Sequence, residues 1–272
     1  MPELPEVEIL ARELRRYAVG RTVACVTTTP DQRLEVGHEQ LPELSDQRLM
    51  DVRRFGKRLA LDFSGGLSLL THLMMVGQWR FSPLAHDVPP DPKLTIEFSD
   101  GTRLYLHGVA LRYQRLLPTD EVTQQEEIQA LGPDALSPGF TADGLASALA
   151  QRNAGIKAVL LEQGLIGGIG NTYADEALYL AGIHPRRPAS DLTREEAIAL
   201  HAAVVQVMRE AIEHGGASEM AFVHLDGSKG HYQDVFRVKE REGQACSRCG
   251  SAIVKERIAG RPTYYCPGHQ RL

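Results

Sequence analysis

The sequence lacks the features that mark several special classes of protein. It has 4 cysteines and 1 tryptophan in 272 residues, and aromatic residues make up 6%. Four cysteines are too few for a scaffold held by disulfides, and the 43% hydrophobic content is too high for a disordered chain. No apolar run reaches the roughly 18 residues that a membrane-spanning helix needs. The acidic start has neither the basic nor the apolar region of a signal peptide. We therefore expect an ordinary folded protein with no membrane segment.

A large net charge is also missing, because 30 basic residues face 35 acidic ones and leave −5. The charge is unevenly distributed, however. From Ser228 to Leu272 we count nine basic and four acidic residues, so this tail carries +5 and the remainder −10. A basic module on an acidic body is expected where one face meets phosphates. A solvated charged surface gives the same pattern, so charge alone does not decide between the two.

Three of the cysteines lie near the end of the chain in a spacing typical of zinc sites. Cys246, Cys249, Cys266 and His269 form the pattern Cys-x2-Cys-x16-Cys-x2-His. Two short knuckles joined by a hairpin can bring four such ligands to one tetrahedral Zn2+, and a site filled by protein ligands is structural. A disulfide would leave one cysteine over and give His269 no purpose. Cys25, in an apolar run, is expected to be a buried strand residue.

The first half of the chain combines one helix with short strand-forming segments. Apolar residues at helical spacing predict an amphipathic helix over Glu3–Tyr17. Turn signals such as Ser64-Gly65-Gly66 separate the strands that follow. Within Arg53–Phe63, alternating apolar residues predict one buried and one solvated face. The predicted strands are Thr22–Val26, Arg53–Phe63, Leu67–His72, Trp79–Phe81, Leu94–Phe98 and Arg103–Leu106.

From about Glu121 to Phe222 the pattern changes to helical periods. The fold class is therefore α+β multidomain: an antiparallel β-sandwich or barrel with a helix, a helical module, and a zinc hairpin. We place the domain boundaries at 1–118, 119–228 and 229–272. Helices are predicted at Ala142–Ala150, Asn171–Ala181 and Arg194–His214.

Pro2 is a candidate nucleophile. Removal of Met1 would leave a secondary α-amine, which titrates near about 8 rather than near the 10.4 of lysine. Such an amine attacks an anomeric carbon and gives an iminium directly. Glu3 and Glu6 stand in the first helical turn, where carboxylates can shuttle protons to a sugar oxygen. Taken singly, Pro2 also fits a plain helix start and the carboxylates fit plain caps.

Two further segments can contact phosphate. Lys57 shares the inward parity of the predicted strand Arg53–Phe63, so it either snorkels or faces a cleft. The Gly-rich turn Leu165–Gly170 leads into a predicted helix that begins at Asn171, and its amides can hold a phosphate. A plain glycine turn is the competing interpretation.

These motifs occur in one order along the whole chain. They are Pro2-Glu3-Leu4-Pro5-Glu6-Val7-Glu8, Arg54-x-x-Lys57, His72-Leu73-x-Met75-x-Gly77, Gly168-x-Gly170-Asn171-x-Tyr173 and the terminal cysteine pattern. Together they closely resemble the formamidopyrimidine-DNA glycosylase / endonuclease VIII (Fpg/MutM/Nei) family, and the N-terminus is similar to the Fpg branch.

The resemblance implies a catalytic β-sandwich domain flanked by helices, a helix–two-turn–helix domain and a zinc finger. It implies a monomeric base-excision-repair enzyme of the bacterial cytoplasm that flips an oxidised base out of double-stranded DNA, removes it and cleaves the strand by β,δ-elimination. Pro2 would form the Schiff base, Glu3 would protonate the sugar oxygen, Glu6 would assist proton transfer, and Lys57 would aid elimination. DNA contacts are implied for His72, Met75, Lys157, Asn171 and Arg261.

The chain departs from the family pattern at three points. His269 stands where the family usually has a cysteine, although imidazole still ligates zinc. Met74 and Val76 replace small residues beside Met75. Val109 and Leu111 replace the arginine and phenylalanine that fill the gap left by the flipped base, which puts lesion and opposite-base preference in doubt.

Two other classes of function compete with a repair enzyme. One is a paralogue that binds damaged or abasic DNA without cutting it, which the changed filler residues favour. The other is a zinc-ribbon transcription or translation factor, which predicts no dependence on the chain terminus.

Overall fold

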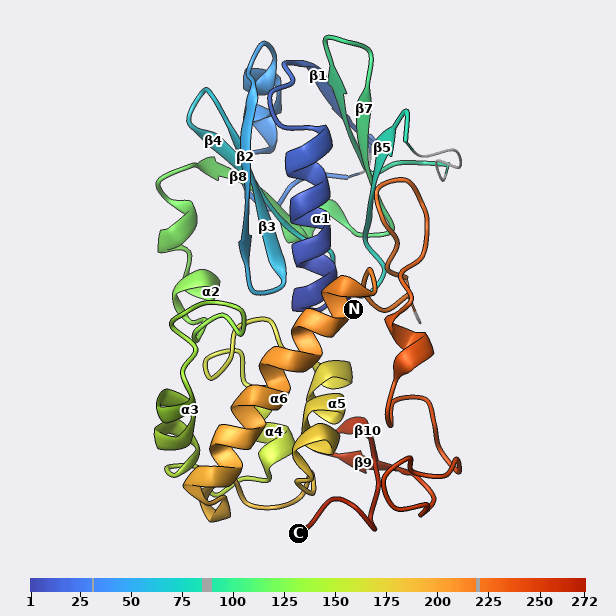
Figure 1. The fold of residues 1–272 in the computed structure, drawn as a ribbon. Coiled ribbons are helices and arrows are strands. Elements are labelled where there is room, and N and C mark those ends of the chain that lie inside the picture. Colours follow the sequence, from blue (N-terminus) through green and yellow to red (C-terminus); the bar gives the residue numbers. More distant parts are fainter. Residues whose placement is uncertain (31, 85–89, 219–220) are drawn as a thin grey trace. The chain divides into compact units, whose positions relative to one another are not determined.

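The computed structural model describes residues 1–30, 32–84, 90–218 and 221–272 (Figure 1). The chain packs into two compact units, one of residues 1–129 with 214–231 and one of residues 130–213 with 232–272. The segment 214–231 thus returns to the first unit after the chain has built most of the second. This division by packing does not test the functional boundaries at 118 and 228, which stay predictions.

Helix α1 (Leu4–Tyr17) opens the first unit. A proline in its first turn and a capping box between Glu3 and Glu6 start the helix, because both supply what an N-terminus needs. Its apolar stripe, which includes Leu4, Val7 and Leu14, is buried. The helix packs along β2 and β3 (Figure 1). The predicted amphipathic helix is confirmed.

Two four-stranded antiparallel sheets form the rest of this unit. One has the order β1-β6-β7-β5 and the other the order β2-β3-β4-β8. The predicted α+β fold with an antiparallel N-terminal layer is confirmed. The strands are β1 (Val23–Thr28), β2 (Leu49–Phe55), β3 (Arg58–Phe63), β4 (Leu67–His72), β5 (Gln78–Ser82), β6 (Leu94–Phe98), β7 (Arg103–His107) and β8 (Gln114–Pro118).

The segment predicted as one strand over Arg53–Phe63 is two strands. The chain turns at Gly56, whose φ of 56° suits glycine, and Lys57 lies in this turn instead of on a strand. The predicted solvated face of β3 is also wrong. Ala60 is fully buried, since Val122 and Ile128 from the chain beyond β8 belong to the same apolar cluster.

Cys25 lies on a strand as predicted, but it is exposed. β1 stands at the edge of its sheet, and its register with β6 shifts between Val23 and Cys25. Such a bulge inserts an extra residue and changes the facing of the side chains after it. The prediction that Cys25 is buried is therefore wrong.

The second unit is helical and ends in a hairpin of β9 (Val254–Ile258) and β10 (Arg261–Tyr265). Helix α5 packs against both α6 and β10 (Figure 1). Among the helices of the described ranges, none has the length and apolar content that crossing a bilayer requires. The helices of this unit are α3 (Ala142–Leu149), α4 (Ile156–Leu160), α5 (Asn171–Ala181) and α6 (Arg194–Glu213); α2 (Glu126–Gln129) belongs to the first unit. Short 3-10 turns occupy His38–Leu44, Leu111–Tyr113, Val122–Gln124, Ala189–Asp191 and Tyr232–Val235.

Candidate functional site

The start of α1 brings Pro2, Glu3 and Glu6 together in one buried turn. Glu3 is 5% exposed and Glu6 is 2% exposed. The amide of Glu3 donates to Glu6 Oε2 at 2.8 Å, which is one half of the capping box. Two acids that have fixed positions beside the chain's first residues can therefore exchange protons there.

The second oxygen of Glu6 is held by the returning segment 214–231. Glu6 Oε1 accepts a hydrogen bond from the amide of Ala217 at 2.9 Å. Gly216 permits this approach: its φ is 82°, and an added Cβ would lie 3.2 Å from Glu6 Cγ. This partner of Glu6 cannot be predicted from the sequence, because a backbone amide leaves no side-chain signature.

Lys57 and His72 lie close enough for their charges to interact. Lys57 is in the turn between β2 and β3, and His72 ends β4. Burial, together with the charges of Arg58 and Lys57, lowers the pKa of His72 to about 4. Gln114 fixes the backbone of His72, because its side chain accepts from the His72 amide at 3.2 Å and donates to the His72 carbonyl at 3.1 Å. His72 is thus a neutral imidazole at neutral pH.

Met75 projects from the loop that follows β4. Its side chain is 57% exposed, and the amide of Gly77 closes the loop on the carbonyl of Leu73 at 2.8 Å. Val109 and Leu111, by contrast, are 5% and 0% exposed and belong to the core. The two residues at the filler positions therefore support packing and present no side chain to solvent.

Lys157 is fully buried and does not present its charge to solvent. Its Nζ lies 2.5 Å from Asp175 Oδ1 and donates to the carbonyl of Asn171 at 2.8 Å. The other oxygen of Asp175 accepts from the amide of Tyr264 in β10 at 3.1 Å. Burial raises the pKa of Asp175 to about 6, against the lowering effect of Lys157. The direct phosphate contact expected for Lys157 does not fit this position; the residue ties α4, α5 and β10 together.

Asn171 and Arg261 meet at the junction of α5 and the hairpin. The side-chain amide of Asn171 donates to the carbonyl of Pro262 at 2.8 Å, and the adjacent Arg261 is exposed. In the glycine turn before α5, the amide of Gly168 already donates to Gln163 Oε1 at 3.1 Å. The second unit therefore places an exposed cation beside a helix N-terminus.

The zinc-type cysteines are brought together as predicted. The Sγ atoms of Cys246, Cys249 and Cys266 all lie within 4.8 Å of one another, a spacing that fits three ligands of one tetrahedral ion. The ring of His269 lies outside this group, and its Nε2 is 3.0 Å from the carbonyl of Tyr179. Ligation by His269 therefore stays a prediction.

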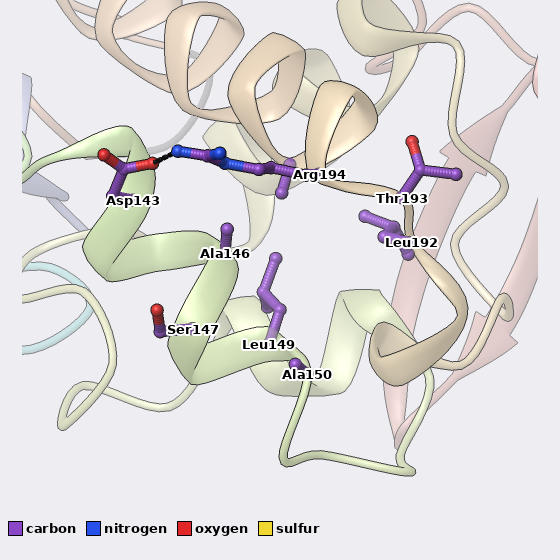
Figure 2. Close-up of a pocket in the computed structure, with 9 residues that line it drawn as sticks. Asp143, Ala146, Ser147, Leu149, Ala150, Leu192, Thr193 and Arg194 are labelled. Carbon is purple, nitrogen blue, oxygen red and sulfur yellow. Dashed lines mark hydrogen bonds and ion pairs between the residues drawn. The ribbon is translucent and has the colours of Figure 1, made fainter.

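Of the two surface pockets described here, one includes a predicted site residue and the other does not. A pocket of about 390 Å³ between α3 and the start of α6 is lined by Leu149, Leu192 and Thr193, with the Asp143–Arg194 ion pair at its side (Figure 2). It contains none of the predicted site residues. A second pocket of about 420 Å³ includes His72 in its wall.

Comparison with known proteins matches nearly the whole chain. Family models match for the formamidopyrimidine-DNA glycosylase N-terminal domain at residues 1–110, the H2TH domain of the same enzymes at 131–222, and a zinc finger found in FPG and IleRS at 243–267. A formamidopyrimidine-DNA glycosylase of Desulforamulus reducens is 35% identical over 100% of this chain and 99% of its own length. Lactococcus lactis Fpg, solved with abasic-site DNA, has a TM-score of 0.89 at 33% identity and covers 99% of this chain and 100% of its own. The same Lactococcus lactis protein, solved with DNA that contains an oxidised pyrimidine, has a TM-score of 0.88 at 33% identity and covers 100% of both chains.

Proposed function

Because the chain belongs to the formamidopyrimidine-DNA glycosylase family, we propose that it is a bifunctional DNA glycosylase and AP lyase that uses Pro2 as its nucleophile. Its substrate is double-stranded DNA with an oxidised base or an abasic site, as in the complexes of Lactococcus lactis Fpg. The observation that carries the proposal is the buried turn in which Glu3 and Glu6 flank the first residues of the chain.

The first step is attack by the Pro2 nitrogen on C1′ of the damaged nucleotide. The C1′–N bond to the base breaks, the base leaves with a proton, and a new C1′–N bond joins the sugar to Pro2. Glu3 protonates the ring oxygen, so that the sugar opens and the linkage becomes an iminium. The lone pair must be free for this attack, so the reaction requires the chain without Met1.

The second step uses the same iminium to cut the strand. The iminium acidifies the C2′ proton; its removal expels the 3′ phosphate, and a further elimination expels the 5′ phosphate. Glu6 accepts and returns protons, because backbone amides hold both of its oxygens in place. Lys57, in its turn beside β3, supplies positive charge to the departing phosphate.

Each unit supplies its own candidate contacts to DNA. In the first unit His72 and Met75 are the candidate contacts, and in the second they are Asn171 and Arg261. When bound, Zn2+ holds the hairpin that carries Arg261 through Cys246, Cys249 and Cys266, with His269 as the predicted fourth ligand. We propose a monomer that works in the bacterial cytoplasm.

Borohydride trapping on an abasic-site duplex tests the assignment. Protein without Met1 should give a covalent adduct that is lost on addition of one residue before Pro2. The adduct should be weakened in Pro2→Gly, which keeps a terminal amine but replaces the secondary amine by a primary one. Pro5→Ala is the matched control, since it alters a proline of the same turn and keeps the terminal amine. An undiminished adduct after addition of one residue before Pro2 would rule out the Pro2 nitrogen as the nucleophile.

A second candidate function is recognition of damaged DNA without cleavage. The burial of Val109 and Leu111 favours it, because neither side chain is exposed to contact a base. Tight binding of an abasic duplex without any trapped adduct would support this function and contradict the enzyme.

A further inference from the structure

Glu6 and Glu13 lie two helical turns apart on α1 and both grip the returning segment 214–231. Seven residues correspond to about two turns, which places the two side chains on one face of the helix. Glu6 Oε1 accepts from the amide of Ala217 at 2.9 Å. Glu13 Oε1 lies 2.6 Å from His224 Nδ1, and Glu13 Oε2 accepts from the amide of Leu225 at 3.0 Å.

Strand β5 holds the same part of the segment from a second side. The side-chain amide of Gln78 donates to the carbonyl of Ala221 at 2.6 Å, and the amide of Phe81 donates to the carbonyl of Leu225 at 3.0 Å. β5 stands at the edge of its sheet, so the segment covers an edge that is otherwise open. The segment is therefore held by β5 on one side and by two carboxylates of α1 on the other.

We propose that Glu13 and His224 are positioning residues for Glu6, holding the segment so that the Ala217 amide stays on the Glu6 carboxylate. The proposal rests on the proposed function, in which Glu6 moves protons. An amide donated to Glu6 stabilises its ionised form, so loss of this amide leaves the group less acidic and less fixed. Glu13 touches neither Pro2 nor Glu3 and acts only through Ala217.

The charge on His224 adds a dependence on pH. The Glu13 carboxylate raises the pKa of His224 against the effect of burial, and the Gly215 carbonyl and Asp226 act in the same direction as Glu13. Arg80 of β5 meets the backbone carbonyl of His224 at 3.4 Å rather than its ring. A histidine with a raised pKa keeps its proton to a higher pH than a free imidazole does and loses it as the pH rises through that value. The Glu13–His224 ion pair therefore weakens as the pH rises above the pKa of His224.

The test compares Glu13→Ala, Glu13→Gln and His224→Gln with the wild type. Steady-state excision kinetics give kcat and KM, and hydrogen exchange gives the protection of the Ala217 amide. Glu13→Ala should lower kcat about tenfold with KM nearly unchanged and should speed Ala217 exchange. Glu13→Gln should recover part of the activity, because its amide oxygen can still accept from the Leu225 amide.

His224→Gln tests the pH dependence of kcat, which would not change if His224 had a purely structural role. Its neutral amide pairs with Glu13 at every pH, so the ratio of its kcat to that of the wild type should rise from pH 7 to pH 9. A ratio that does not change with pH would overturn the part assigned to His224.

Glu8→Gln is the matched control. It removes an ion pair of α1 to Arg54, at 2.8 Å, without touching the returning segment. An equal loss of kcat in Glu8→Gln and Glu13→Ala, or unchanged Ala217 exchange in Glu13→Ala, would overturn the proposal. Faster Ala217 exchange in Glu13→Ala together with an inactive wild type would instead refute the proposed function and leave the positioning contact standing.

Discussion

Buried charged side chains show how a residue's role depends on what surrounds it. The family resemblance implies a DNA contact for Lys157, yet its ammonium is enclosed with the Asp175 carboxylate. Glu6 is equally buried but is held by backbone amides. A buried ion pair neutralises its charges, whereas amides leave the carboxylate ionised and able to take a proton.

Lys157→Met should destabilise the second unit by about 3–5 kcal/mol, because the Asp175 carboxylate would be left buried without its cation. Urea unfolding measures the loss. Lys229→Met, on an exposed lysine, serves as the control and should change stability by less than about 0.5 kcal/mol. If Lys157→Met kept its stability and lost only DNA affinity, the lysine would be a phosphate contact after all.

His72 should make the protein less stable in mild acid. Its pKa is lowered from 6.5 to about 4, so the unfolded chain binds a proton between these values that the folded chain does not. Stability is therefore lost as the pH falls from about 6.5 towards about 4. His72→Gln should flatten this part of the curve of unfolding free energy against pH. An identical pH slope in wild type and His72→Gln would show that the imidazole titrates normally.

At the scale of elements, the sequence predicted those with a strong local pattern and missed those whose pattern is interrupted or short. The helix at Asn171–Ala181 and the strand at Leu67–His72 were predicted to the residue. The strand pair around Gly56 is not separated by the sequence pattern, because Phe55 on one side of the turn has the same parity as Leu59 and Leu61 on the other. β8 was overlooked, since only two of its five positions are strongly apolar between Gln114 and Pro118.

The candidate site divides in the same way. Pro2, Glu3, Glu6 and the three clustered cysteines are local motifs, so the sequence contains them directly. The partner of Glu6 is the backbone of Ala217, more than two hundred residues along the chain. Only the fold creates such a contact. The seven-residue spacing of Glu6 and Glu13 is the sequence feature that could have indicated the contact of Glu13 with His224 and Leu225.

The hairpin should depend on its metal, because three thiols cluster at its base and a structural zinc supplies folding free energy directly. Cys249→Ser should lower the zinc content below one ion per chain and speed amide exchange in residues 243–267. Cys25→Ser, at an exposed position of β1, should leave both unchanged. Full zinc content in Cys249→Ser would exclude this thiol as a ligand.

At the scale of the whole molecule, an acidic chain must bind a polyanion through a local excess of positive charge. The net charge is −5, so the electrostatic potential of the molecule as a whole repels DNA. Binding then relies on individual cations such as Arg261, each of which displaces a counterion.

Arg261→Ala should weaken DNA binding similarly for all sequences and reduce the slope of log K against log salt by about 1. Fluorescence anisotropy across a salt series measures this slope. The control is Arg33→Ala, on a 71% exposed arginine of the first unit. An unchanged slope in Arg261→Ala would mean that this side chain meets no phosphate.

The first unit is discontinuous, since residues 214–231 belong to it along with residues 1–129. On the ribosome the nascent chain emerges from its N-terminus, so the amide of Ala217 is made only after most of the second unit. The proton-handling carboxylate therefore receives its full set of contacts late in translation. A prematurely terminated product would display the open margin of β5 and be a natural target for proteases or chaperones.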